Sequence, residues 1–174
     1  MSAGVFTFPV VIACAVLVWA GLEKIRAPSS LAATVRALGG PPRFATMSAL
    51  IVPIAELVTV ILVVTGVPAY LPAALFAVLG TAFAAAGLGA IGSRTEIPCA
   101  CFGVSERKLG WPQVAVLPLW LLAGWSVIHM PAFGLRARLE TSAVAIVLLT
   151  VSRAVSAVRH SVTARRDRRA FAGG

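Results

Sequence analysis

Two cysteines separated by a single residue are the most reactive feature of the sequence. Cys99 and Cys101 lie in the segment Pro98-Cys99-Ala100-Cys101-Phe102-Gly103, in which proline and glycine favour a tight bend. Thiols at this spacing can close a small, strained disulfide ring, and strained disulfides exchange more readily than structural ones. The pattern favours a dithiol that cycles with a disulfide, and a simple buried turn is the alternative that stays open.

A zinc site is the competing chemistry for these thiols. Structural zinc takes four ligands, and the remaining cysteine and histidine residues are Cys14, His129 and His160. His129 ends the apolar segment that follows, roughly 28 Å away by helix rise. We therefore expect no metal site, and we expect Cys14, in the middle of an apolar segment, to be a small packing residue.

Glu56 is the single charged residue between Phe44 and Ser93, a run of 50 positions. An acid near the centre of a membrane span costs about 2.5–3.5 kcal/mol on insertion scales, so such residues usually serve a pathway, a proton step or a buried ion pair. Two arrangements stay open. Glu56 is either protonated and hydrogen-bonded to a neighbouring helix, or paired with Lys24.

The elements that must position these residues are membrane-spanning helices. Apolar residues make up 59% of the 174 positions and charged residues 12%, against about 45–50% and about 25% in soluble domains. This composition excludes a soluble enzyme, a disordered tail and a disulfide-rich secreted module. The chain is expected to be a multi-pass protein of the cell membrane, the inner membrane of a bacterium.

Five apolar stretches are expected to form spans: residues 5–22, 46–66, 69–92, 111–130 and 142–158. The fifth is the weakest, because only the 12 residues from Thr141 to Ser152 are free of charge before Arg153, whose side chain would have to extend to the headgroups. A short interfacial helix is expected between the first two spans, begun by Pro28-Ser29-Ser30 and ended by Gly39-Gly40.

The third stretch carries a pattern of small residues that predicts close helix packing. They recur every fourth position, with Gly80, Ala84 and Gly87 beside them: Ala73, Ala77, Thr81, Ala85 and Gly89.

The net charge of +9 arises from 15 basic and six acidic residues. The basic residues gather in short loops and in the C-terminal tail, which is typical of membrane proteins and their contact with anionic lipid. No basic stripe interleaved with aromatic residues is present, so the expected partner is membrane lipid and not nucleic acid.

Three motifs in the same order resemble the methylamine utilisation MauE family, which is grouped with DoxX-like membrane proteins. They are Ala20-Gly21-Leu22-Glu23-Lys24-Ile25, Pro53-Ile54-Ala55-Glu56-Leu57 and Cys99-Ala100-Cys101-Phe102-Gly103. The resemblance covers roughly residues 5–130. It implies an all-α, DoxX-like four-helix transmembrane bundle over residues 1–130, to which residues 131–158 add a C-terminal helix and 159–174 a basic tail.

The resemblance also implies a function: thiol/disulfide exchange during maturation of a periplasmic amine dehydrogenase subunit, alongside a thioredoxin-like or client redox protein. Cys99 and Cys101 would be the catalytic pair, while Lys24 and Glu56 match family positions without a settled role. The resemblance establishes no cofactor, and a quinone is the electron acceptor considered. Two other functions stay open, a non-catalytic assembly subunit and a small proton-coupled transporter that uses Glu56.

The distribution of basic residues predicts the topology. With five spans, the loop 23–45 (four Lys or Arg), the loop 93–109 (three) and the tail from Arg153 (six) share one side, so 4 + 3 + 6 gives 13 against two on the other. With four spans the division is 8 to 7. Because basic loops stay in the cytoplasm, five spans with a cytoplasmic tail are expected, and the cysteine loop then faces the cytoplasm.

Reporter fusions test this topology. A fusion after Gly174 should give a cytoplasmic signal, and a fusion within residues 131–139 should give an outside signal. A cytoplasmic signal within 131–139 would contradict the five-span prediction. It would also place the cysteine loop outside, the compartment in which disulfides persist.

Overall fold

The computed structural model describes residues 4–93, 96–99 and 108–129, together with the single positions 143, 147 and 151. Cys101, the basic tail 159–174 and, apart from those three positions, the predicted fifth span 142–158 lie outside the described residues. The described segments form the helices α1 (Gly4–Arg26), α2 (Pro28–Ala37), α3 (Pro42–Thr65), α4 (Tyr70–Ser93), α5 (Trp111–Ala115) and α6 (Leu117–His129).

Four helical segments are long and apolar enough to cross a membrane: Thr7–Arg26, Pro42–Thr65, Tyr70–Ser93 and Trp111–His129. They confirm the all-α membrane fold and the first four predicted spans. The fourth span is two helices rather than one, because Pro118 has no N–H to donate to the carbonyl of Val114. The chain instead breaks at Val116, whose carbonyl accepts hydrogen bonds from the N–H groups of Leu119 and Trp120.

The boundaries of α2 and α3 follow from proline and glycine. Pro28 and Pro42 each occupy the first helical position, where a missing N–H costs nothing. Gly39 follows α2 with a φ of 85°, and Gly66 ends α3 with a φ of 70°. Both are left-handed conformations that glycine adopts without a steric penalty. The predicted short helix between the first two spans is therefore present as α2.

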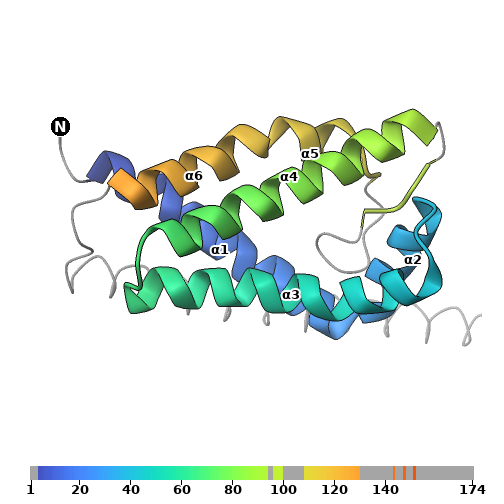
Figure 1. Cartoon of the computed structure of the whole chain (residues 1–174), viewed down its shortest axis with the longest axis horizontal. Coiled ribbons are helices and arrows are strands. Elements are labelled where there is room, and N and C mark those ends of the chain that lie inside the picture. Colours follow the sequence, from blue (N-terminus) through green and yellow to red (C-terminus); the bar gives the residue numbers. More distant parts are fainter. Residues whose placement is uncertain are drawn as a thin grey trace, which may run out of the picture.

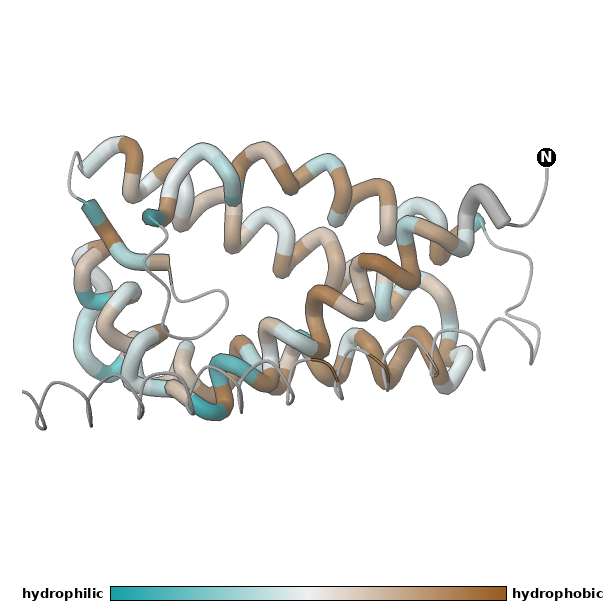
Figure 2. Tube along the Cα trace, turned by 180° about the vertical axis from the view of Figure 1, so that it is seen from behind, coloured by the Kyte–Doolittle hydropathy of each residue, from teal (hydrophilic) through white to brown (hydrophobic). Residues whose placement is uncertain are grey.

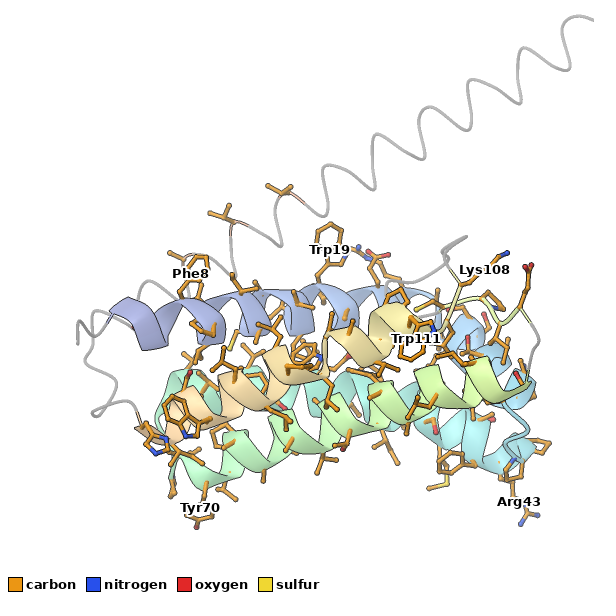
Figure 3. The ribbon with its side chains drawn as sticks, turned by 90° about the horizontal axis from the view of Figure 1, so that it is seen from above. Phe8, Trp19, Arg43, Tyr70, Lys108 and Trp111 are labelled. Atoms are coloured by element: carbon orange, nitrogen blue, oxygen red, sulfur yellow. The ribbon has the colours of Figure 1, made fainter. Side chains whose placement is uncertain are left out.

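The long helices lie alongside one another as an antiparallel bundle (Figure 1). Helix α4 packs most extensively on α6, and α1 packs on both α3 and α6. One end of the bundle carries α2 and α5, together with the start of α3 and the end of α4 (Figure 1). Arg43 and Lys108 mark this end, whereas Tyr70 lies at the opposite end (Figure 3).

Large apolar side chains cover the outside of the bundle as well as its core. Exposed examples run along the length of α3 and α4, including Leu50, Ile61 and Val78. Figure 2 shows hydrophobic residues throughout the long helices and hydrophilic residues gathered at the end that carries α2. An apolar exterior on every long helix is what a lipid environment requires.

The face of α4 that packs inward differs from the predicted stripe. Thr81, Ala85 and Gly89 are exposed, whereas Gly80, Ala84 and Gly87, which lie beside that stripe in sequence, are buried. Four residues turn an α-helix through about 400°, so a strict four-residue repeat drifts around the helix by about 40° at each step. The buried face of α4 follows mixed spacings of three and four residues instead.

Helices α4 and α6 approach each other closely at Gly80. A Cβ at this position would lie 2.6 Å from Trp120 Cβ and 3.0 Å from Trp120 Cγ. We expect Gly80→Ala to lower the stability of the protein in detergent, since overpacking costs about 1–3 kcal/mol. Thermal unfolding followed by circular dichroism measures the change.

Gly92→Ala is the matched control on the same helix, because a Cβ there meets nothing within 4 Å. Both substitutions bring the same gain in helix propensity. Equal unfolding temperatures for the two variants would contradict the close α4–α6 contact.

Candidate functional site

Lys24 and Glu56 form an ion pair inside the bundle. Lys24 Nζ lies 2.6 Å from Glu56 Oε1, and the two side chains are 1% and 0% exposed. Of the two arrangements left open by the sequence, the structure has the ion pair. Because α1 continues to Arg26, Lys24 belongs to a spanning helix and is not a loop residue. Arg26 is the last residue of the same helix, and without these two charges the predicted division of basic residues is 11 to 2.

Small and aromatic residues enclose this pair. A Cβ on Gly21 would lie 3.4 Å from Glu56 Oε2 and 3.3 Å from Leu57 Cγ, so glycine lets α1 approach α3 closely at this level. On the other side, Lys24 Nζ lies 5.4 Å from the centre of the Phe83 ring, at cation–π distance. The ion pair therefore ties α1 to α3 and also contacts α4.

The aromatic contact extends to α6. The ring centres of Phe83 and Trp120 are 6.2 Å apart, and Trp120 also stacks on Phe76. Among the described residues, Glu56 Oε2 and Trp120 Nε1 are buried without a hydrogen-bond partner. The centre of the bundle thus combines an ion pair, made through one oxygen of Glu56, with aromatic side chains.

The segment before Cys99 is fixed at the end of the bundle that carries α2. The hydroxyl of Thr34 in α2 lies 3.0 Å from the carbonyl oxygen of Pro98 and 3.1 Å from that of Ser30, and it shares its one proton between them. Leu109 N–H donates to the carbonyl of Ile97 at 2.8 Å, and Pro98 pairs with Lys108 in an antiparallel bridge. Glu96 and Lys108 also form an exposed ion pair. Residues 96–99 therefore have a defined position between α2 and residues 108–110.

Cys99 is 4% exposed and lies in a small cluster with Ala90, Ile97 and Leu109. Gln113 of α5 contacts its sulfur, with Nε2 3.2 Å from Sγ. The same side chain accepts a hydrogen bond through Oε1 from the N–H of Gly110 at 2.8 Å. Because the Gly110 N–H can only donate, the carbonyl end of the amide faces Gly110 and the NH₂ end faces Cys99.

Cys14 and Cys99 belong to different parts of the protein. Cys14 is buried in the main core of α1, α3, α4 and α6, together with Leu17 and Phe76. The Lys24–Glu56 pair borders this core through Phe83, whereas Cys99 lies in the separate cluster at the α2 end. In the part of the chain that the structure describes, no three His, Cys, Asp or Glu side chains are close enough to hold a metal ion.

Sequence reasoning did not identify Gln113 or Thr34. Gln113 was discoverable, since it is an amide two residues after Trp111, at the start of a span that holds no charged residue. Its hydrogen bond to a cysteine 14 positions earlier depends on how the loop folds back, and no periodicity predicts that. The contact of Thr34 could not be predicted for the same reason, since its partner Pro98 is 64 positions away.

Residues 1–129 match the model of the family described as methylamine utilisation protein MauE. The match covers all six helices and the segment of Cys99. A search of curated proteins and a search of solved structures each found no match.

The ion pair predicts a specific pattern of stability in single and double variants. Removing one partner of a buried pair leaves an uncompensated charge and costs about 3–5 kcal/mol. We therefore expect both Glu56→Gln and Lys24→Met to lower abundance and unfolding temperature, and we expect the double variant to recover part of the loss. Unfolding in detergent, analysed as a double-mutant cycle, gives the coupling energy.

Glu23→Gln is the matched control. Glu23 pairs with Arg26 at 2.5 Å on the same helix, but this pair is partly exposed to solvent and is expected to contribute at most about 1 kcal/mol. Unchanged stability in Glu56→Gln would contradict a structural ion pair and would return Glu56 to the role of a protonated acid.

Proposed function

The chain belongs to the MauE family, and from this membership and the geometry around Cys99 we propose that it performs thiol/disulfide exchange during maturation of a partner protein. The cysteine pair Cys99 and Cys101 would carry the exchange. The family description refers to methylamine utilisation, so an amine dehydrogenase subunit is the client class we propose. The client would meet the cysteines directly or through a thioredoxin-like protein.

The observation that carries this proposal is the defined position of Cys99. Hydrogen bonds from Thr34, Leu109 and Gln113 hold the segment that contains it, and an amide N–H₂ group is directed at its sulfur. A cysteine that merely fills space needs no such donor. A sulfur with a donor beside it, one residue from a second cysteine, is suited to alternate between thiolate and disulfide.

The exchange itself needs few groups from the protein. A thiolate of the partner attacks the Cys99–Cys101 disulfide, and the second thiolate of the partner resolves the mixed disulfide, so that the partner is oxidised and the cysteine pair is reduced. Transfer of the electrons onward requires a two-electron acceptor, for which a membrane quinone is the class we propose. Lys24 and Glu56 support this chemistry by fixing the helices and not by contact with Cys99, because the two groups lie in different clusters.

The ion pair also bears on the transporter alternative. A proton site that works by cycling needs an acid whose charge is free to change, whereas Glu56 contacts a buried lysine at 2.6 Å. This contact supports a structural role for Glu56. The thiol content of the protein under oxidant distinguishes redox function from the assembly-subunit alternative.

We predict that Cys99 and Cys101 cycle between dithiol and disulfide. Membranes are acid-quenched, the protein is denatured, and its thiols are counted by mass after maleimide labelling. The chain has three cysteines, so the reduced protein should take three labels and the oxidised protein one, on Cys14. Diamide treatment and then dithiothreitol should move the protein from one label back to three.

Single variants provide the control. Cys99→Ser and Cys101→Ser should each keep two labels under oxidant and lose the ability to mature a client, whereas Cys14→Ala should cycle and function normally. Three labels after every oxidant, or normal client maturation in both loop variants, would contradict redox function and favour an assembly subunit.

A further inference from the structure

Gln113 of α5 contacts the sulfur of Cys99, one of the two cysteines of the proposed redox pair. Its Nε2 lies 3.2 Å from Cys99 Sγ. We infer that Gln113 is a positioning residue that stabilises the thiolate of Cys99, so that Cys99 is the sulfur that leaves and Cys101 the one that takes the partner. This inference rests on the proposed thiol/disulfide exchange and assigns a role to each cysteine.

The orientation of the amide follows from its own anchor. Gln113 is the third residue of α5, and its Oε1 accepts from the N–H of Gly110 at the start of that helix, at 2.8 Å. This is the reach-back half of a capping box. With the oxygen engaged, the NH₂ group is directed at Cys99, and it can only donate. A donor stabilises the charged sulfur more than the neutral thiol.

The backbone that carries Gln113 is itself fixed by α4. At Gly87, an added Cβ would lie 2.8 Å from the Gly110 carbonyl oxygen and 3.1 Å from Gln113 Cβ. Helix α5 therefore rests directly on the backbone of α4 at the point where Gln113 and its anchor lie. Any side chain at position 87 must displace the residues that hold the amide.

Burial decides which sulfur meets a protein partner. Cys99 is 4% exposed and packs against Ala90, Ile97 and Leu109. A partner thiolate needs an open approach in line with the disulfide, so a sulfur enclosed in this way is a poor target for attack. The sulfur that leaves as a thiolate does not have to be reached by the partner, and at Cys99 the NH₂ group of Gln113 stabilises its charge. The attacked sulfur is then that of Cys101.

The exchange balances as follows. A thiolate of a partner dithiol attacks the sulfur of Cys101, the Cys99–Cys101 bond breaks, and its electron pair leaves with Cys99 as a thiolate. The second partner thiolate attacks the partner sulfur of the mixed disulfide and expels Cys101 as a thiolate. The partner is oxidised by two electrons to a disulfide and the pair is reduced by two. The protons released by the partner thiols pass to the new thiolates or to water.

The test is the pH dependence of Cys99 alkylation by iodoacetamide in full-length Cys101→Ser protein in detergent, with the modified residue identified by mass. Gln113→Leu keeps the volume and removes the donor. It should shift the pH midpoint of alkylation upward by about one unit and reduce the rate at pH 7 roughly tenfold. Gln113→Glu, which turns acceptors toward the sulfur, should shift it at least as far.

Gly87→Ala and Gly92→Ala form a matched pair that leaves Gln113 itself intact. Gly87→Ala should raise the midpoint by displacing the amide, whereas Gly92→Ala, with nothing within 4 Å of its Cβ, should leave it unchanged. These two glycine variants test the role of Gln113 even if Gln113→Leu does not fold. The burial of Cys99 slows alkylation in every variant alike and does not move the midpoint. An equal midpoint with and without the Gln113 donor overturns the inference.

Glutathione disulfide tests the division of roles. Cys99→Ser protein should form a mixed disulfide with glutathione through Cys101 at least tenfold faster than Cys101→Ser protein does through Cys99. The reverse order overturns the assignment. Failure of the proposed function gives a different result. The unsubstituted protein would then keep three maleimide labels under every oxidant, whatever the pH dependence of Cys99 alkylation.

Discussion

The buried ion pair between Lys24 and Glu56 constrains how the bundle is built. Each charge is acceptable in an apolar interior only while the other is present, so α1 and α3 must meet at a level where Lys24 reaches Glu56. Gly21 permits that approach, since it leaves space beside Glu56 Oε2 and Leu57. Phe83 covers the ammonium group from α4. The ion pair therefore helps to fix the positions of α1, α3 and α4 relative to one another. Apolar packing alone would do so less specifically, because lipid contacts apolar helix surfaces as favourably as another helix does.

The position of Cys99 depends on a second set of contacts at one end of this bundle. Helix α2 supplies Thr34, α5 supplies Gln113, and α4 supplies the glycine on which α5 rests. The break at Val116 divides the fourth span into two helices, α5 and α6, which contact different parts of the protein. Helix α6 carries Trp120 into the core, while α5 is free to adopt the orientation that brings Gln113 to the sulfur.

Much of the architecture could be predicted from residue types, and the reasons are physical. Long apolar runs require spans, and proline and glycine mark the ends of α2 and α3, so the bounds of these helices follow closely. The inward face of α4 could not be read from a four-residue repeat, since that repeat winds around the helix. The choice between a protonated Glu56 and a pair with Lys24 depended on where α1 ends, and the charged sequence Glu23-Lys24-Ile25-Arg26 suggests a loop although it is helical.

The residues around Cys99 show why a motif alone does not determine a site. Cys99 and Cys101 look equivalent in the sequence, with one residue between them and a bend on either side. The structure gives Cys99 a specific environment, because it packs against Ala90 of α4, Ile97 and Leu109 and is faced by an amide held through its own oxygen. This environment arises from contacts 14 and 64 positions apart in the chain. Cys99 thereby acquires an environment that its motif does not encode, and an ordered exchange through a closely spaced pair needs a difference between its two thiols.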